Sequence, residues 1–494
     1  MADIVFTHSY FYRFDHKQWE QIREPYPPLG TVWAASLMRE EGYSVALHDT
    51  NFAFGAEELI PVLEKEKPRY LVIYDDGFNF LTKMCLTKMR EAAFEMAKLG
   101  KKVGCKVLVC SSDSTDHTDK YLAEGVDYVI QGEGEQTLLE SLRALEAGNT
   151  DLSEVPGLTY LQEGERVRTR PRSVMRDLDA LPDPAWDLID FSVYQDFWQN
   201  AHGYFALNLA TTRGCPYKCN WCAKPIYGNR YNVRSPKRVV DEIAMLQEKT
   251  GVKYFWMCDD IFGLKPGWVQ EFNQLSKERG LSFKYKIQSR VDLMLNDNQI
   301  DALAESGLDT VWVGAESGSQ AILDAMDKGT KLEQIHQATA QLQKHGIKVA
   351  FFLQFGYLKE TAEDIQKTLK LVKQAMPDQI GISVSYPLPG TKFYDKVKAD
   401  LGLKQNWEDS DDLDLMFENT YPSAYYKRLQ RYVHKLHRRW LAMQWLRQKG
   451  WQPWRLDKWQ YRRVLGIPYY LVSGWVDEWN LRSLQRKAHA GGRV

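Results

Sequence analysis

Three cysteines in one short loop constrain this chain more than any other feature. Cys215, Cys219 and Cys222 follow an apolar strand predicted over 205–210, at Cys-x3-Cys-x2-Cys spacing. A loop of this length can bring three thiolates to one [4Fe–4S] cluster but offers no fourth thiolate, so one iron would stay open. An open iron at a strand end favours chemistry, whereas four protein ligands suit electron transfer. The alternative is a zinc site or unpaired thiols, although zinc usually takes four ligands in two separated pairs.

The other cysteines support the iron–sulfur interpretation. They form no second pair at metal-ligand spacing: Cys85, Cys105, Cys110 and Cys258. Few cysteines, three of them clustered, argue against a secreted disulfide scaffold and for a reducing cytosol. The N-terminus shows no signal peptide, and no apolar run approaches the roughly 20 residues that span a bilayer. We therefore expect a cytoplasmic protein, at most peripheral to the membrane.

Length and charge set broader limits. The chain has 494 residues, which predicts two or three domains. Its formal net charge of −1 gives no overall attraction to nucleic acid or to a membrane.

The cysteine spacing resembles that of the radical S-adenosylmethionine (SAM) superfamily, and Trp221, just before the last cysteine, belongs to the same pattern. The resemblance implies that the open iron binds the amino and carboxylate groups of SAM. An electron from the cluster would then cleave the sulfonium and release a 5′-deoxyadenosyl radical, which abstracts hydrogen from unactivated carbon. A reductase such as flavodoxin or ferredoxin would supply that electron.

Residues 1–150 alternate short apolar strands with helical stretches, which predicts a doubly wound, Rossmann-like (flavodoxin-like) α/β domain. Its ligands would lie at the carboxyl ends of the strands. The expected strands are 4–6, 44–47, 70–74, 106–110 and 127–131, and the expected helices include 31–41, 81–99 and 118–124.

This region resembles the cobalamin-binding (B12-binding) domain fused to many radical SAM enzymes. The resemblance rests on Pro27-Pro28-Leu29-Gly30 and on Gly132-Glu133-Gly134-Glu135, and it implies cobalamin contacts at Gly132 and Gly134. Two features depart from the family. The Asp-x-His-x-x-Gly motif is absent, and side chains at Cys110–Asp113 replace a Gly-Gly pair that would let the nucleotide tail approach. A Rossmann-like domain that only packs on its neighbour or shapes a cleft remains the alternative.

Residues 151–200 are predicted to be a linker, and 201–424 a partial (β/α)6 radical SAM barrel. The linker includes a strand pair near 155–160 and 166–169 and a proline-rich crossing at 181–186. Catalytic groups of such barrels gather at the carboxyl ends of strands. The expected strands are 205–210, 254–258, 283–288, 310–314, 349–355 and 379–386.

Polar residues follow these strands, and the family resemblance gives them SAM contacts. Asp259 and Asp260 would receive the SAM amino group, although Asp259 could equally cap a helix. Arg290 would meet a SAM carboxylate or a substrate anion, Glu316 would accept hydrogen bonds from a ribose, and Ser317 is a further expected SAM contact. Gly356 would leave room for adenine. No catalytic acid, base or radical-quenching residue can be assigned.

Residues 425–494 form a basic, tryptophan-rich C-terminal region with a helix predicted over 425–449. Sixteen Lys/Arg stand against three acidic residues here. This composition suggests contact with an anionic membrane or a lipid-like substrate, and the alternative is a helical cap with solvated arginines. No nucleic-acid-reading module accompanies the charge, so no nucleic acid is expected.

Together these features predict a cobalamin-dependent radical SAM methyltransferase that acts on an unactivated carbon or phosphorus. The alternative is a radical cyclase or rearrangement enzyme, with or without cobalamin, for a tetrapyrrole, lipid or natural product. The anaerobic magnesium-protoporphyrin cyclase shares this architecture. A remote alternative is a non-enzymatic iron–sulfur carrier or sensor, which would normally use four protein ligands.

Overall fold

The structure is a computed structural model that describes residues 1–490 apart from 85, 225, 297, 403 and 405, so Cys85 lies outside the described residues. These residues form two compact units. The first comprises 1–217, 223–288 and 406–412, and the second comprises 218–222, 289–405 and 413–494. These units are made of discontinuous segments and do not test the predicted domain bounds at 150, 200 and 424, which stay a prediction.

The first unit contains a seven-stranded sheet with strand order β2-β1-β3-β4-β5-β6-β7. The first five strands are parallel, and their order confirms the flavodoxin-like prediction. The order reverses between β1 and β3, which makes the carboxyl ends of these two strands the expected ligand edge. The bounds are β1 Ile4–Thr7, β2 Val45–His48, β3 Tyr70–Tyr74, β4 Lys106–Cys110 and β5 Tyr128–Ile130.

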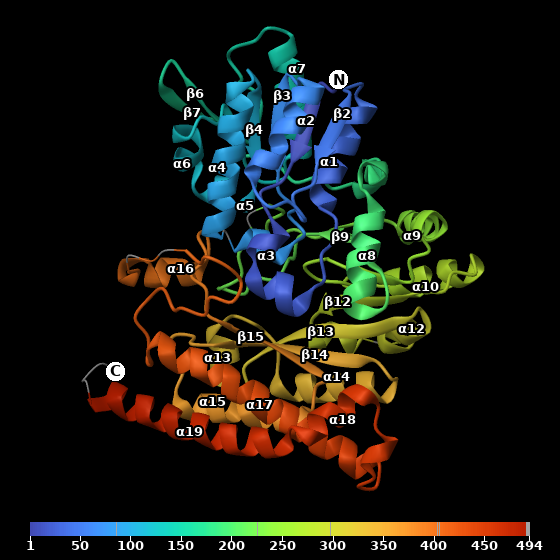
Figure 1. The fold of residues 1–494 in the computed structure, drawn as a ribbon, viewed down its shortest axis with the longest axis vertical. Helices are drawn as coiled ribbons and strands as arrows, with labels where there is room; N and C mark the ends of the chain where they lie inside the picture. The colour runs from blue at the N-terminus through green and yellow to red at the C-terminus, as the bar shows by residue number, and fades with distance from the viewer. Residues whose placement is uncertain (85, 225, 297, 403, 405, 491–494) are drawn as a thin grey trace. The chain divides into compact units, whose positions relative to one another are not determined.

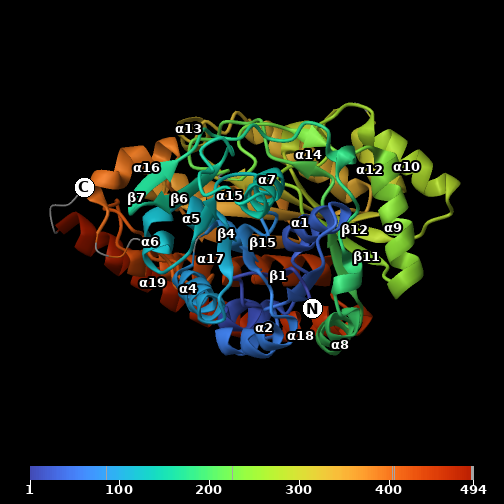
Figure 2. The ribbon, with the colours of Figure 1, turned by 90° about the horizontal axis from the view of Figure 1, so that it is seen from above.

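Helices cover both faces of this sheet, as Figure 2 shows for α1 and α7 on one side and α2 and α4 on the other. Apolar residues from α2, α4 and α6 pack with Val5, Ile73 and Val107 into one buried core. The helix predicted over 81–99 is interrupted, because the chain leaves helical geometry at Leu86. The bounds are α1 Leu29–Glu40, α2 Leu59–Glu66, α3 Phe80–Lys83, α4 Thr87–Lys102, α5 Ser112–Asp116, α6 Thr118–Ala123 and α7 Glu135–Glu146.

Part of the predicted linker belongs to this sheet. β6 (Leu158–Gln162) pairs antiparallel with β5, and β7 (Glu165–Arg168) pairs with β6. The expected strand pair is therefore present and extends the Rossmann-like sheet at its edge. Helix α8 (Phe191–His202) follows, with Asp190 as its N-cap and Gly203 as its left-handed C-cap.

Each unit holds three strands of the predicted barrel. In the first unit β11 (Tyr254–Met257) pairs in parallel with both β8 (Ala206–Leu209) and β12 (Lys284–Ser289). In the second unit β14 (Lys348–Phe355) pairs in parallel with both β13 (Leu308–Glu316) and β15 (Gln379–Val384). The associated helices are α9 Pro236–Thr250, α10 Trp268–Glu278, α11 Val291–Met294, α12 Gln299–Glu305, α13 Gln320–Ala325, α14 Leu332–Lys344, α15 Ala362–Ala375 and α16 Lys392–Val397.

The C-terminal region is helical, as predicted. Helix α17 (Ser423–Gln448) packs on α15 and β15, and it supports α18 (Lys458–Leu465) and α19 (Ile467–Ala490), as Figure 1 shows within this unit. Leu429, Val433 and Leu436 are buried along α17, which confirms the helical spacing expected there.

Candidate active site

The cysteine loop begins and ends at one short pair of strands. β9 (Thr212–Arg213) pairs antiparallel with β10 (Asn232–Val233), so residues 214–231 leave and return at the same place. Gly214 opens the loop with a φ of 79°, and a Cβ there would stand 2.5 Å from the carbonyl oxygen of Arg230. Glycine alone combines this left-handed backbone with so close an approach. The base of the loop is therefore fixed by the backbone itself.

Asp259 holds the chain that leads into the loop. Its carboxylate accepts hydrogen bonds from the backbone N–H groups of Thr211 and Thr212, both at 2.7 Å, and from the Thr211 hydroxyl at 2.5 Å. Burial raises the pKa of this carboxyl to about 7, although the bonds from Thr211 and Thr212 lower it. In this structure Asp259 is a positioning residue for the loop. Its neighbour Asp260 forms an ion pair with Lys83 at 2.5 Å.

Arg213, the last residue before the loop, lies in a buried ionic network. Its guanidinium donates to Glu133 at 2.5 Å and to Glu135 at 2.7 Å, and all three side chains are at most 6% exposed. The rings of Trp33 and Tyr227 lie about the guanidinium at 5.0 and 5.2 Å. The two carboxylates of the Gly-Glu-Gly-Glu segment thus bind the residue that precedes the cysteines.

The three motif cysteines differ from the other described cysteines in exposure. Cys215, Cys219 and Cys222 are half-buried and form no disulfide, whereas Cys105, Cys110 and Cys258 are buried. Burial raises the pKa of Cys105 to about 11, and it raises the pKa values of Cys110 and Cys258 well above the ordinary value of a thiol. Accessible thiols of this number and spacing fit a cluster with three protein ligands. The described residues contain no group of three or more His, Cys, Asp or Glu side chains gathered as for a metal ion.

The part of the loop in the second unit is anchored by Asn220, which lies between Cys219 and Cys222. Its backbone N–H donates to the Met326 carbonyl at 3.0 Å and its side-chain N–H to the Ala325 carbonyl at 2.7 Å. The Tyr357 hydroxyl donates to its amide oxygen at 2.9 Å. Neighbouring Trp221 packs against an apolar cluster that includes Tyr357 and Phe393. The aromatic position of the motif therefore helps to seat the loop.

An ion pair of the second unit lies beside Cys219. Lys328 donates to Glu316 at 2.8 Å, and both side chains are buried. Burial lowers the pKa of Lys328, but Glu316 and then Cys219 raise it by more, so the ammonium stays charged. Glu316 has a φ of 56°, a strained backbone of the kind that gathers at functional sites. A cation therefore stands within electrostatic reach of a predicted thiolate ligand.

Arg290, predicted to meet a SAM carboxylate or a substrate anion, is fixed by its own neighbours. Its guanidinium donates to both oxygens of Asp292 at 3.0 Å and to the carbonyl of Lys328 at 2.8 Å. Arg290, Glu316, Lys328 and Cys219 are thus linked within the second unit. Their grouping agrees with the predicted site, while their contact with SAM stays a prediction.

Two predicted SAM residues are occupied by protein contacts. The hydroxyls of Ser317 and Thr368 lie 3.2 Å apart, which ties the end of β13 to α15. Gly356 has a φ of 77°, and a Cβ there would stand 3.2 to 3.4 Å from Leu415, Tyr426 and Asn419. The space beside Gly356 is therefore filled by residues that follow the barrel strands.

Gln354 is a candidate site residue that the sequence alone did not indicate. By strand alternation it shares a face of β14 with Phe352, which stacks on Trp312 with ring centroids 4.7 Å apart. Gln354 is 1% exposed, and neither amide atom has a hydrogen-bond partner within the described chain. A buried amide without partners costs free energy, so this group is available to a ligand. The available signal was one glutamine inside the apolar run 349–355.

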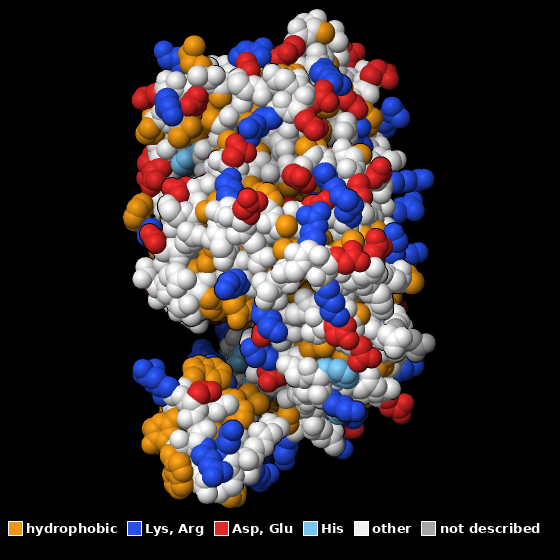
Figure 3. All heavy atoms as spheres, turned by 90° about the vertical axis from the view of Figure 1, so that its right-hand side faces the viewer, with side chains coloured by type: hydrophobic (Ala, Val, Ile, Leu, Met, Phe, Trp, Pro, Cys, Tyr) orange, Lys and Arg blue, Asp and Glu red, His pale blue; other side chains and the backbone are white. Residues whose placement is uncertain are grey.

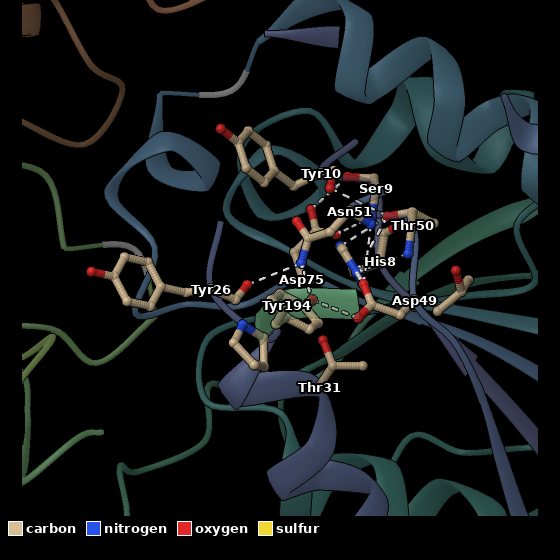
Figure 4. Close-up of polar contacts among 12 residues, drawn as sticks. His8, Ser9, Tyr10, Tyr26, Thr31, Asp49, Thr50, Asn51, Asp75 and Tyr194 are labelled. Carbon is tan, nitrogen blue, oxygen red and sulfur yellow. Dashed lines mark hydrogen bonds and ion pairs between the residues drawn. The ribbon is translucent and has the colours of Figure 1, made fainter. Parts of the chain in front are cut away.

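The ligand edge of the Rossmann-like sheet carries a polar network, shown in Figure 4. After β1, His8 contacts Asp49 at 3.0 Å, and Ser9 donates to Asp75 from its backbone N–H and its hydroxyl, both at 2.7 Å. The Tyr194 hydroxyl of α8 donates to Asp49 at 2.6 Å. The carboxyl ends of β1, β2 and β3 are therefore joined by hydrogen-bonded side chains that are buried or half-buried.

Two buried hydroxyls at this edge have no hydrogen-bond partner among the residues that the structure describes: Tyr10 after β1 and Ser112 after β4. In Figure 4 the Tyr10 ring points away from the network around His8. Orphaned polar atoms at the switch point fit a polar ligand such as cobalamin.

The predicted cobalamin glycines fit less well. A Cβ at Gly134 would stand 2.5 Å from Cys110 Sγ and 3.0 Å from the Tyr74 ring, so protein side chains fill the room that Gly134 leaves. A Cβ at Gly132 would stand 3.6 Å from the Ile226 carbonyl oxygen. The segment in place of the Gly-Gly pair starts α5, where Ser111 and Ser114 form a capping box and Asp113 pairs with Arg90. Ser111 and Asp113 therefore have structural partners, whereas the Ser112 hydroxyl has none among the described residues.

Comparison with known families identifies the class. Residues 209–372 match the family model of the Radical SAM superfamily, a range that includes all three motif cysteines. Residues 209–372 are therefore a radical SAM domain, a kind of domain whose cofactors are a [4Fe–4S] cluster and SAM, and the protein is an enzyme. Enzymes of this class use a reductant and small-molecule substrates.

Individual proteins match more of the chain. An uncharacterized methyltransferase of Pyrococcus horikoshii is 29% identical over 387 residues, which cover 77% of this chain and 81% of that protein. The anaerobic magnesium-protoporphyrin IX monomethyl ester cyclase of Rubrivivax gelatinosus is 29% identical over 56% of this chain and 50% of its own length. The chain thus spans half of that cyclase.

One solved structure resembles nearly the whole chain. The cobalamin-dependent SAM radical enzyme OxsB, solved with aqua-cobalamin bound, matches with a TM-score of 0.72 and 16% identity. The match covers 97% of this chain and 72% of OxsB. This likeness confirms the predicted fold, namely a Rossmann-like domain, a radical SAM barrel and a helical C-terminal region.

Replacing Arg213 by Met should destabilise the protein by about 3–5 kcal/mol, because it leaves Glu133 and Glu135 buried without their cation. Urea unfolding followed by tryptophan fluorescence measures the change. The control is Arg166→Met, which removes a surface pair with Asp119 and should cost less than about 1 kcal/mol. Equal effects of the two changes would contradict a structural role for the buried network.

Stability should fall as the pH rises from about 4 to about 7, because Asp259 titrates near 7 when folded and near 3.8 when unfolded. Unfolding then releases a proton within this pH window, and the loss of stability remains at higher pH. Asp259→Asn loses a hydrogen-bond acceptor at every pH but gains relative to the wild type as the pH rises, by on the order of 4 kcal/mol. Urea midpoints at pH 4 and pH 8 test this, with the exposed Asp196→Asn as the control. A pH-independent difference for Asp259→Asn would exclude the shift.

Proposed function

We propose that this chain is a cobalamin-dependent radical SAM methyltransferase that acts on an unactivated carbon or phosphorus of a small-molecule or lipid-like substrate. The observation that carries the proposal is that one chain holds both a Rossmann-like domain and a radical SAM domain. The 2-1-3-4-5 Rossmann-like sheet offers unpartnered polar groups at its ligand edge, and the radical SAM domain holds the cysteine motif. The likeness to a methyltransferase over 81% of its length supports methyl transfer.

The chain's own residues would bind and orient the cofactors. Cys215, Cys219 and Cys222 would hold the cluster and leave one iron for SAM. When bound, the cluster supplies the electron that cleaves SAM. Asp259 and Asn220 fix the backbone on the two sides of Cys215 and Cys219, and Lys328 keeps a positive charge beside Cys219.

Cobalamin would lie at the edge formed by the carboxyl ends of β1, β3 and β4. The hydroxyls of Tyr10 and Ser112 would contact it, because they are buried and lack partners among the described residues. His8 is bound to Asp49 and Thr50, so it is not assigned to cobalt. The cofactor's role in this chain would be to carry the methyl group.

A second candidate function is a radical cyclisation, and the likeness to the magnesium-protoporphyrin cyclase favours it. That likeness covers 56% of this chain, against 77% for the methyltransferase relative, so we place methyl transfer first. A non-enzymatic iron–sulfur carrier or sensor is excluded by the radical SAM domain.

The partners follow from this chemistry. A flavodoxin or ferredoxin would deliver the electron, and the enzyme would work in the cytoplasm or at the membrane surface through residues 425–494. Nucleic acid is not part of the proposal.

Cys219→Ala should lose most of its iron and its SAM cleavage while it stays folded, because two cysteine thiolates hold a [4Fe–4S] cluster less well than three. Iron per chain and 5′-deoxyadenosine are measured after anaerobic reconstitution, and circular dichroism reports folding. Cys105→Ala, which removes a buried thiol, should keep both properties. Full iron and full SAM cleavage in Cys219→Ala would refute the assignment.

The double variant Tyr10→Phe, Ser112→Ala should bind cobalamin roughly tenfold more weakly or worse, because two hydrogen-bond donors are lost. Cobalt per chain, measured at limiting cobalamin with iron measured in parallel, reports this. Thr159→Val removes a buried, unpartnered hydroxyl in the middle of β6 and is the matched control. Unchanged cobalt in the double variant would place the cofactor elsewhere.

A further inference from the structure

The C-terminal helices expose large apolar side chains that a soluble surface seldom carries. Trp454 is 75% exposed, Trp475 69%, Val472 68% and Leu465 63%. The same segment exposes Trp451, Trp459, Tyr469, Leu471, Val476 and Trp479. Contiguous exposed apolar surface of this kind marks an interaction site.

These side chains follow the geometry of a helix surface. On α19 the exposed positions 472, 475, 476 and 479 recur at helical spacing, and positions 474, 477 and 481 of the opposite face are buried. Asp477 fixes this orientation, because it accepts from Arg428 at 2.9 Å and from Lys435 at 2.6 Å on α17. Helix α19 therefore packs on α17 with one face and presents an apolar face outward.

The charge around this face is positive. Residues 425–494 hold sixteen Lys/Arg and three acidic residues. All three acidic residues are engaged: Asp477 is buried between two cations, Glu478 pairs with Arg482, and Asp457 caps α18. Arg463 stacks on Trp459 at 3.7 Å, so basic and aromatic groups interleave. Figure 3 shows hydrophobic side chains gathered with Lys and Arg at the lower end of the molecule, where α18 lies in Figure 1.

We propose that α18 and the exposed face of α19 dock on an anionic lipid bilayer, with the tryptophans in the interfacial layer and the basic residues at the headgroups. In the part of the chain that the structure describes, no helix is long and apolar enough to cross a membrane, so the segment lies in the plane of the interface. This inference deepens the partner part of the proposed function but does not depend on the cluster.

Charge and exposed apolar side chains favour a bilayer over two other occupants, a second copy of the chain and nucleic acid. A second copy of the chain would bring two strongly basic surfaces together, which is repulsive. Nucleic acid would match the charge but would leave Leu465, Val472 and Val476 without an apolar partner. Of these three occupants, only an anionic bilayer satisfies both the positive charge and the exposed aliphatic side chains.

The test is co-sedimentation of the full chain with vesicles. Wild type should bind vesicles of phosphatidylcholine with phosphatidylglycerol, bind pure phosphatidylcholine much more weakly, and dissociate as salt is raised. Trp475→Ser with Trp479→Ser, and separately Arg462→Gln with Arg463→Gln, should each weaken binding roughly tenfold or more. The matched control is Phe54→Ser, which removes an exposed ring of the first unit and should bind like wild type.

Several results would overturn the proposal. These are equal binding to both vesicle types, unchanged binding by both double variants, binding to duplex DNA in place of vesicles, and a stable dimer that does not sediment with lipid. Circular dichroism of the tryptophan variant controls for folding. Cys219→Ala should still bind vesicles, and the tryptophan variant should still cleave SAM in solution, so a failure here is distinct from a failure of the proposed chemistry.

Discussion

The buried contact of Arg213 with Glu133 and Glu135 is the interaction on which the arrangement of the first unit depends. It joins the end of the Rossmann-like sheet to the strand that opens the cysteine loop. Taking three ionic groups out of water costs free energy, and close pairing offsets that cost; a well-packed apolar cluster of similar volume is often as stable. The direct effect of the network is on position, because Arg213 is the residue that precedes the cysteine loop.

Two residues that were predicted to contact SAM, Asp259 and Arg290, also make hydrogen bonds that fix the protein around them. Asp259 binds two backbone N–H groups ahead of the loop, and Arg290 is held by Asp292 and a carbonyl. This is how a reactive centre is kept rigid: the supporting contacts fix the positions of groups that meet a cofactor. Lys328 joins this support to the loop, since it is paired with Glu316 and lies near Cys219.

The sequence predicted the strands well, because apolar runs bounded by turns leave few alternatives; β3 and β4 have the predicted bounds. It also predicted the cysteine motif, whose spacing is local. It could not predict contacts between distant segments. Glu133 and Arg213 are 80 residues apart in the sequence. Gln354 stands out only because its amide has no hydrogen-bond partner among the described residues, which the sequence cannot show. The glycines at 134 and 356 showed the same limit, since each makes room for a side chain of the protein itself.

The β9–β10 pair gives the cysteine segment the character of an insert. Its two ends are joined by backbone pairing, so its length can change without moving the strands on either side. Loop-closure entropy rises only slowly with added residues, so such changes are cheap. Within one scaffold, residues could therefore be inserted or removed near the two ends of the segment, whereas Asn220 and Trp221 would have to be kept, because they contact residues outside it.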